Sequence, residues 1–592
     1  MKHITLLFKY SLVFLVCLSC NKKTSPVEGT VKDVIDNAVT RLYKQLSAAE
    51  LDTISDAYIR GFLSPEEKQV LATKFWTFDV NVPVTVSLMR DTAQKIVPFW
   101  IEESGFKKTD MFVKNEEYTY EVWQRSFDKG IVGLGINGFD KHRPVYFISV
   151  APQKKEDSLQ VSNVYPAEYN LSVMQKGAFT YHDWDGLVLT VVPAELTGQV
   201  LFTTVRGRAR EAHLTGAFRK TNTPSSDKPD QLLLTWSADP KTTVNVQWRT
   251  GMDVKEGIAK YWKVGGSDTL TTVADVFEME DRLLQNDRYV KRFTARLTGL
   301  TPGAEYGYNV GAKGGSWSEV ERFRTESDKQ KDFSFIWFGD THYSKIWGDM
   351  AQKAFNRHPD AAFYSIAGDL VSTGLHRNEW DELWNHSGGV FSKRPLMPVP
   401  GNHDSQDGLG AWMYQEMFSL PENGPDKLPK EMTYSFVYGD AQFLMIDGTL
   451  PVKAQTAWIE NQLKNSKSKW KFAMFHFPPY NFVEPYEEIM SEWCSLFDKY
   501  HVDMVMSGHM HYYLRTKPMF AGKAVDKASK GTIYTMSISI PGKQDEWPDE
   551  DYAIVRYPDG PLYQHIVIRD NKLFYRSLDP DGKVKDELII EK

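Results

Sequence analysis

The chain has 592 residues, which is too long for a single hydrophobic core and predicts two to four domains. Its composition, 42% hydrophobic and 25% charged, is that of a globular protein, and the net charge of -7 argues against nucleic-acid binding through a basic face. Of the three cysteines, only Cys494 lies beyond the first twenty residues. A metal site built from cysteines is therefore excluded, and any metal must be held by His, Asp, Asn or Glu.

Residues 1–19 are typical of an export signal. Lys2 and Lys9 precede an apolar stretch, Ser11 to Leu18, that is shorter than the ~20 residues needed to span a bilayer. The segment ends in "CLSC", and a Cys after a small residue resembles the lipobox of bacterial lipoproteins. This predicts lipid attachment at Cys20 and an exported lipoprotein of the cell envelope, in the periplasm or at the cell surface. Cleavage without a lipid anchor is the alternative.

Two β-rich regions follow a helical segment. Residues 20–75 predict a tether and helices, because "TRLYKQLSAAEL" has helical spacing and good helix formers. Residues 76–220 contain runs such as "FDVNVPVTVSLMR" and "GLVLTVVP", which predict a β-rich domain of unknown role and a candidate for glycan or protein contact. Residues 230–326 have strands at sandwich-like spacing, and "LTGLTPGAEYGYNV" resembles a fibronectin type III module.

Residues 331–592 change to an α/β pattern, in which apolar strands alternate with helical stretches. The predicted strands are "FSFIWF", "AAFYSIA", "PLMPVP", "KWKFAMFH" and "VDMVMSGH". The run "YSFVYGDAQFLMID" predicts a hairpin, and the tail from about residue 532 returns to strands.

Each of the five predicted strands ends in a polar cluster. In chain order these clusters are "GDTH", "GDLVSTG", "GNHD", "FHFPP" and "GHMH". Because ligands bind beyond the carboxyl ends of strands in open α/β sheets, we expect the clusters to converge on one site. His509 and His511 are expected on a strand, where residues two apart share a face. Carboxylates, an amide oxygen and several imidazoles suit two ions among Mn, Fe and Zn.

The ordered set of clusters resembles the calcineurin-like metallophosphoesterase superfamily over about residues 332–580. The preceding fibronectin-like module and the ending "GHMHYYLR" are similar to its purple acid phosphatase branch. The resemblance implies a multidomain protein, with a β-rich N-terminal region and a fibronectin-like sandwich before an α/β metallophosphoesterase domain, itself a β-sandwich flanked by helices.

The resemblance also implies residue roles. One ion would be held by Asp340, His342, Asp369 and His511, and the other by Asp369, Asn402, His476 and His509, with Asp369 as the bridge. His403 would lie near the leaving group as a general acid or as a stabiliser of developing charge. Asp404 would orient His403.

The chain departs from the purple branch in its metal ligands, because its first motif also supplies His342, as in the non-purple members. Purple enzymes carry a Tyr three residues after the second-motif Asp, where this chain has Ser372, so a colourless centre is expected. The sequence "FPPYNF" after His476 offers no further histidine for substrate contact. The candidates for shaping the pocket, each also consistent with a structural or surface role, are Tyr343, Ser344, His376, Arg377, His386, Tyr480, Tyr512 and Tyr513.

The resemblance implies an exported, acid phosphatase-like phosphohydrolase that cleaves phosphomonoesters by attack of a metal-bound hydroxide. One alternative is a phosphodiesterase that acts on nucleotides or lipid head groups. Another is a surface binding or adhesion protein in which the β modules carry the function and the metal site is unused. The complete ligand set argues against this last alternative.

Overall fold

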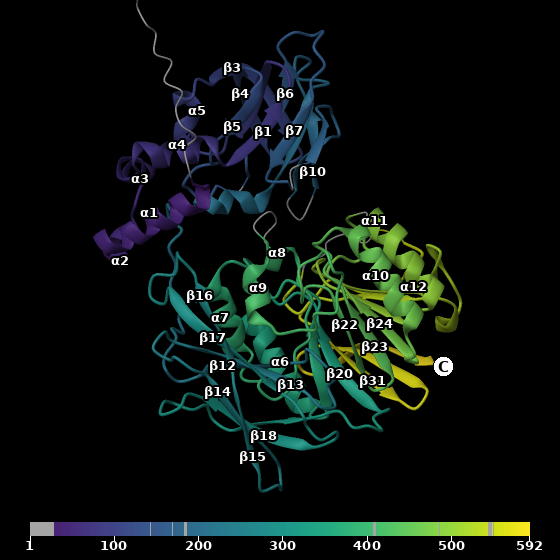
Figure 1. Ribbon diagram of the computed structural model, residues 1–592. Coiled ribbons are helices and arrows are strands. Elements are labelled where there is room, and N and C mark those ends of the chain that lie inside the picture. The colour runs from purple at the N-terminus through teal and green to yellow at the C-terminus, as the bar shows by residue number, and fades with distance from the viewer. Residues whose placement is uncertain are drawn as a thin grey trace, which may run out of the picture.

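The computed structural model describes residues 29–142, 144–167, 170–182, 186–405, 410–484, 486–542, 548 and 550–592. The predicted export signal and Cys20 lie outside the described residues. Three units follow one another along the chain, and Figure 1 shows the first of them above the other two. None of the helices in the described part of the chain is both long and apolar enough to cross a membrane.

The N-terminal unit packs helices against a curved sheet. Thr30, Ser47 and Ser64 each begin a helix with a capping box, in which the side chain and the acidic residue three positions later bind each other's backbone amides. The main sheet has the order β6-β2-β4-β3-β10-β9-β11-β8 and closes on itself through a β6–β11 pairing. The helices and the sheet share one apolar core.

The bounds of this unit are as follows. The helices are α1 Val31–Gln45, α2 Ala48–Leu51, α3 Asp56–Phe62, α4 Pro65–Thr73, α5 Phe99–Glu103 and the 3-10 helix η1 Arg206–Ala212. The strands are β1 Trp76–Val80, β2 Val84–Asp91, β3 Lys107–Asn115, β4 Thr119–Phe127, β5 Gly130–Leu134, β6 Phe147–Pro152, β7 Val161–Tyr165, β8 Asn170–Val173, β9 Phe179–His182, β10 Gly186–Val191 and β11 Val200–Val205.

The second unit is a β-sandwich of two four-stranded sheets, with the orders β12-β13-β17-β16 and β15-β14-β18-β19. Its core is continuous with that of the third unit. Trp236, for example, lies 5.6 Å from the ring of Phe363 and 5.4 Å from that of Tyr438. The strands are β12 Asp230–Thr235, β13 Val244–Thr250, β14 Ile258–Lys263, β15 Thr269–Val273, β16 Asp275–Glu280, β17 Tyr289–Leu297, β18 Glu305–Gly311 and β19 Glu321–Arg324.

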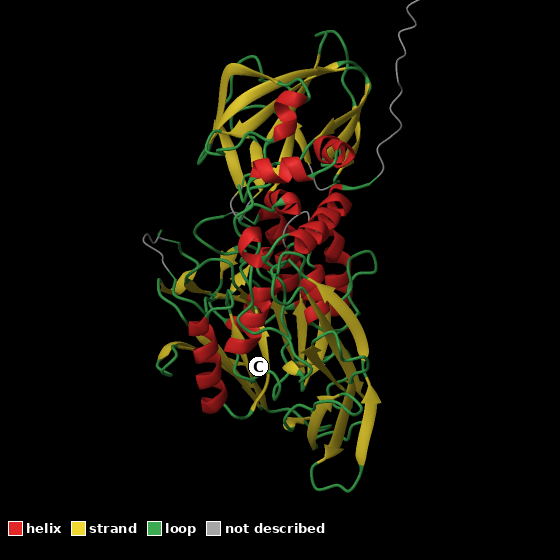
Figure 2. Cartoon of the chain, turned by 90° about the vertical axis from the view of Figure 1, so that its left-hand side faces the viewer, coloured by secondary structure: helices red, strands yellow, loops and turns green. Residues whose placement is uncertain are grey.

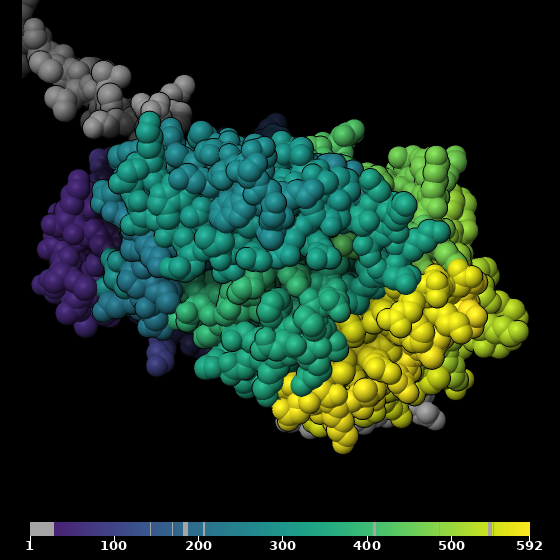
Figure 3. Space-filling model, turned by 90° about the horizontal axis from the view of Figure 1, so that it is seen from below, coloured from purple at the N-terminus to yellow at the C-terminus, as the bar shows by residue number. Residues whose placement is uncertain are grey.

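The third unit packs two sheets, with the orders β21-β20-β31-β32-β33 and β22-β23-β24-β25-β29-β26-β30. Figure 2 shows many of the helices at the level between the N-terminal strands and the lower sheets. From below, the second unit (teal) and the C-terminal strands (yellow) lie on the same face (Figure 3). The multidomain fold expected from the sequence is confirmed.

The main strands and helices of this unit have the following bounds. The strands are β20 Phe333–Phe338, β21 Ala361–Ile366, β22 Tyr434–Tyr438, β23 Ala441–Met445, β24 Trp470–Met474, β25 Met504–Ser507, β26 Tyr513–Thr516, β29 Ile533–Met536, β30 Ala553–Tyr557, β31 Tyr563–Arg569, β32 Lys572–Leu578 and β33 Val584–Glu591. The helices are α6 Lys345–Arg357, α7 Arg377–His386, α8 Asn402–Ser405, α9 Trp412–Met417, α10 Val452–Asn465, α11 Glu487–Ile489 and α12 Ser495–Tyr500.

One predicted strand, "PLMPVP" at residues 395–400, is wrong. Within it only Leu396 and Val399 make isolated β-bridges, to Tyr364 and Ala367. Three of its six residues are prolines, which have no N–H to donate to a ladder, so the segment runs beside β21 without forming a regular strand.

Glu326 links the second and third units, and its burial makes the stability of the protein depend on pH. It is buried and accepts a hydrogen bond from the Gly439 amide at 2.8 Å. Burial raises the pKa of Glu326 to about 7 from the ordinary value of 4.5. In that interval the folded state binds more protons at this carboxyl than the unfolded state, so its contribution to stability falls as the pH rises.

We expect Glu326→Gln, which keeps the acceptor oxygen and is neutral at every pH, to stabilise the protein by about 1 kcal/mol near pH ~8, after allowance for screening by water. Near pH ~4.5 the effect should be small, because the glutamate is then largely neutral as well. Thermal unfolding at the two pH values measures this. An equal loss of stability at both would contradict the assignment.

Candidate metal centre

Polar side chains from the loops after β20, β21, β24 and β25 meet at the carboxyl ends of these strands. Their ligand atoms form three overlapping groups, within each of which all atoms lie within 4.8 Å of one another. The groups are Asp340, His342 and His511; His342, Asp369 and His403; and Asp369, His476 and His509. Asn402 joins them, because its Oδ1 lies 3.0 Å from His476 Nε2. The structure thus brings together all seven predicted ligands.

The two carboxylates, Asp340 and Asp369, are 0% and 1% exposed. Asp340 Oδ1 accepts from the His509 amide at 2.7 Å, and Asp369 Oδ1 accepts from the His403 amide at 2.9 Å. Asp340 Oδ2 is buried without a hydrogen bond among the described residues, although His511 Nε2 lies 3.2 Å away. A buried acceptor without a donor is costly, and a cation at this point would remove that cost. The donor set therefore fits metal ions.

Three histidines have one ring nitrogen fixed by the protein. His476 Nδ1 lies 2.8 Å from the Ala367 carbonyl oxygen, and His403 Nδ1 lies 2.7 Å from the carbonyl oxygen of Ser372. His342 Nδ1 lies 3.2 Å from the Ser372 hydroxyl. Because each Nδ1 is engaged, each Nε2 is left to face the carboxylates, an arrangement typical of metal-ligating histidines.

Opposite charges dominate the electrostatics of the centre. Burial acts to raise the pKa of Asp369, but the imidazoles of His476, His403 and His342 hold it well below its ordinary value. Burial acts to lower the pKa of His476, but the Asp369 and Asp340 carboxylates raise it to about 9. In the absence of ions the cluster therefore retains protons, and binding of metal releases them.

The backbone of the site is held in unusual conformations. His342, Asp369 and His509 have φ values of 42°, 52° and 73°, in the left-handed region that few residues other than glycine adopt. A Cβ on Gly508 would lie 2.2 Å from Asp340 Oδ1, so only glycine fits there. The expectation that His509 and His511 lie on a strand is wrong. They lie in the loop between β25 and β26, where the turn separates them into different ligand groups.

The role predicted for Asp404 is also corrected. Its fully buried carboxylate accepts three backbone hydrogen bonds at 2.9–3.1 Å, from Leu370, Val371 and Gly401. The carbonyl of Ser372, and not the Asp404 carboxylate, faces His403 Nδ1. Asp404 therefore joins the third loop to the second and acts on His403 only through the backbone.

Arg377 is a structural residue and not part of a substrate pocket. Its side chain is buried and donates to Asp287 at 3.1 Å and to Asp381 at 3.4 Å. Arg249 of the second unit contacts Asp381 at 2.8 Å, so the same network joins the sandwich to α7. These buried ion pairs therefore connect the second unit with the third.

The three predicted pocket tyrosines of the C-terminal half are structural as well. Tyr513 is 0% exposed and its hydroxyl contacts Asp586 at 2.6 Å. Tyr480 packs on Tyr534 with ring centroids 4.7 Å apart, and Tyr512 stacks on Phe482 at 5.6 Å.

The remaining pocket candidates lie around the first two loops. Tyr343 is partly buried against the core, and its carbonyl oxygen lies 2.8 Å from His386 Nδ1. Ser344 caps α6 through its hydroxyl. His376 Nδ1 lies 3.1 Å from Glu379 Oε1, and burial with the cations of Arg219, Arg210 and Lys141 holds the pKa of His376 well below its ordinary value.

Sequence reasoning missed Glu484. Its Oε2 lies 3.9 Å from His509 Nε2, on the side opposite His509 Nδ1, which lies 3.2 Å from His476 Nε2. Tyr486 donates to the same carboxylate. At this distance the Glu484 carboxylate faces the His509 ring as a nearby negative charge without a hydrogen bond to that ring. No motif marks Glu484, which stands eight residues after His476 in an irregular segment.

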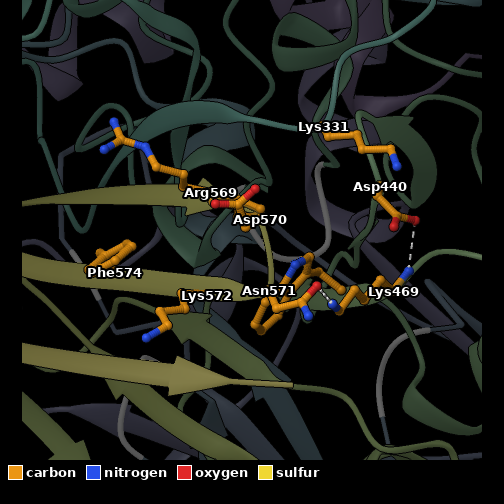
Figure 4. A pocket seen from close by; sticks show the side chains of 10 residues that line it. Lys331, Asp440, Lys469, Arg569, Asp570, Asn571, Lys572 and Phe574 are labelled. Atoms are coloured by element: carbon orange, nitrogen blue, oxygen red, sulfur yellow. Dashed lines mark hydrogen bonds between the residues drawn. The ribbon is translucent and has the colours of Figure 1, made fainter.

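A hollow of about 560 Å³ lies away from this centre, beside β31 and β32 (Figure 4). Four basic side chains line it, together with Asp440 and Asp570. None of the predicted metal ligands lines this hollow. The basic residues are Lys331, Lys469, Arg569 and Lys572.

Comparison with known families gives two matches. Residues 229–325 match the purple acid phosphatase N-terminal domain, and residues 333–513 match the calcineurin-like phosphoesterase family. A solved structure of a purple acid phosphatase from yellow lupin seeds aligns with a TM-score of 0.54 at 16% identity, covering 88% of this chain and 94% of that one. At this identity the likeness shows a shared fold.

Several proteins are similar in sequence. Purple acid phosphatase 23 of Arabidopsis thaliana is 26% identical over 362 residues, which cover 51% of this chain and 77% of that protein. Purple acid phosphatase 21 of the same plant is 25% identical over 242 residues, covering 38% and 53%. An uncharacterized protein of Mycobacterium tuberculosis is 26% identical over 288 residues, covering 41% and 54%. The chain thus spans about half the length of the Mycobacterium tuberculosis protein and of purple acid phosphatase 21.

The corrected role of Asp404 leads to a prediction. Asp404→Asn leaves a single acceptor oxygen for three backbone donors and turns an NH2 group toward them, so we expect a loss of about 1–3 kcal/mol in the free energy of unfolding. Denaturant unfolding measures this, with the exposed acid Asp426→Asn as the matched control. If Asp404→Asn kept wild-type stability, the proposed tie between the loops would be refuted.

Proposed function

We propose that this chain, whose residues 229–513 belong to the purple acid phosphatase-like branch of the calcineurin-like metallophosphoesterases, hydrolyses phosphomonoesters. The observation that carries the proposal is the convergence of four imidazoles, an amide oxygen and two buried carboxylates on one point. One of those carboxylates, Asp340, has a buried oxygen without a hydrogen bond among the described residues, which a bound cation would satisfy. A full ligand set of this kind suits two ions among Fe, Mn and Zn.

Two bound ions supply an acidified water and positive charge for the phosphoryl oxygens. The residues of the chain do the rest. Asp369 belongs to two of the three ligand groups, one with His342 and His403 and the other with His476 and His509. His403 has its Nδ1 fixed at Ser372 and its Nε2 4.0 Å from Asp369 Oδ2, beside the centre. From this position Nε2 is placed to give a proton to the departing alcohol.

Phosphodiester hydrolysis is the second candidate, and Glu484 favours it. A carboxylate near the centre repels a dianionic monoester more strongly than a monoanionic diester. The seven metal ligands serve either reaction, so the choice between the two rests on the surroundings of the centre.

Turnover of p-nitrophenyl phosphate and bis(p-nitrophenyl) phosphate tests the proposal. The mature protein is reconstituted in turn with Mn, Fe and Zn. We expect faster turnover of the monoester, with a loss of more than about 100-fold in Asp369→Ala, because that variant removes the shared ligand. Preference for the diester would assign the protein to the second candidate. No turnover with any metal would remove generic phosphatase activity and leave the role of a surface binding protein.

We further propose that the chain is exported and anchored by a lipid at Cys20, in keeping with the charged start, the apolar stretch and the "CLSC" ending. Expression of the full chain and of Cys20→Ser tests this. We expect the wild type in the detergent phase after phase partitioning and the variant in the aqueous phase. An equal distribution of the two would show that Cys20 carries no anchor.

A further inference from the structure

The turn at residues 372–374 lies between a candidate metal ligand and the candidate acid. The Ser372 hydroxyl is 3.2 Å from His342 Nδ1, and the Ser372 carbonyl oxygen is 2.7 Å from His403 Nδ1. The Gly374 amide donates to the His403 carbonyl oxygen at 2.8 Å. One residue thus contacts two histidines of different function through two different groups.

Glu379 on α7 holds this turn in place. Its Oε2 accepts from the amides of Ser372 and Thr373 at 3.0 Å and 2.7 Å. The glutamate is 8% exposed, and its second oxygen lies 3.1 Å from His376 Nδ1. The neighbouring Trp380 donates to the Gly374 carbonyl oxygen at 2.8 Å, so the start of α7 binds the turn at three backbone groups.

We propose that Ser372, held by Glu379, is a positioning residue that orients His342 toward the metal and His403 toward the leaving group. The inference rests on the proposed function for its second half only. The hydroxyl fixes which nitrogen of His342 faces the centre, and the carbonyl fixes the ring of His403. The two contacts use different atoms of Ser372, so they are separable by mutation.

Ser372→Ala tests the hydroxyl. This variant removes the partner of His342 Nδ1 and leaves the carbonyl, the turn and His403 unchanged. We expect retention of metal in competition with a chelator to weaken about 10-fold, as is typical for loss of a group behind a metal ligand. The relative turnover of substrates with good and poor leaving groups should stay at the wild-type value. Asn385→Ala, at an exposed position of α7, is the control.

Glu379→Ala tests the turn. Without the carboxylate, the carbonyl of Ser372 is no longer held against His403, and proton donation to the alcohol becomes less efficient. We expect the ratio of kcat for p-nitrophenyl phosphate to kcat for an alkyl phosphate to rise about 10-fold, because p-nitrophenolate leaves without a proton. His403→Ala should raise the same ratio. Glu379→Gln, which keeps an oxygen for the two amides, should recover part of the loss.

Two results would overturn the inference. The first is Ser372→Ala with wild-type metal retention, and the second is Glu379→Ala with a wild-type leaving-group ratio and intact fold by circular dichroism. If the wild type hydrolyses no phosphate ester, the proposed function fails. In that case metal retention by Ser372→Ala and Glu379→Ala, both expected to fall, still decides whether the turn positions His342.

Discussion

Asp340 and Asp369 place two carboxylates in the interior of the third unit, each with one oxygen on a backbone amide and the other turned toward imidazoles. Removing a carboxylate from water costs several kcal/mol unless opposite charge is brought to it. The surrounding loops bring positive charge to the two carboxylates through histidines and the protons that these carry. Bound metal ions would add to this charge. The remaining features of the site follow from bringing positive charge to these two buried oxygens.

The same demand explains the shape of the loops. To reach the carboxylates, the chain must turn sharply as it leaves each strand, which accounts for the left-handed conformations of His342, Asp369 and His509. A bridge between Asp340 and Ile538 ties the end of β20 to the segment after β29, so the two sheets present their carboxyl ends to one point. Asp404 and Glu379 then fix the loops by accepting backbone amides that would otherwise be unpaired.

The sequence allowed prediction of the features that depend on local pattern. Apolar runs followed by Gly-Asp and Gly-His marked the strand ends, and the resemblance to metallophosphoesterases that rested partly on them is confirmed by the family matches. Features that depend on which group from a distant part of the chain meets a side chain were not predictable. Asp404 was assigned to the adjacent histidine, and its real partners come from another loop. Tyr513 followed the histidine motif closely in sequence, yet its hydroxyl points to Asp586 on a distant strand.

The N-terminal unit brings charge close to the same turn. Arg282 of the second unit pairs with Asp36 of α1 and donates to the Glu211 carbonyl oxygen, which fixes that unit over the sandwich. Burial and the charge of Arg219 lower the pKa of His376, and two cations of the N-terminal unit, Arg210 in η1 and Lys141, add to this effect. His376 contacts Glu379, and Glu379 holds the turn between His342 and His403. Charges of the N-terminal unit thus act, through His376 and Glu379, on the turn that contacts His342 and His403. The residues before 229, which neither family match covers, therefore contribute charge to the surroundings of the candidate metal centre.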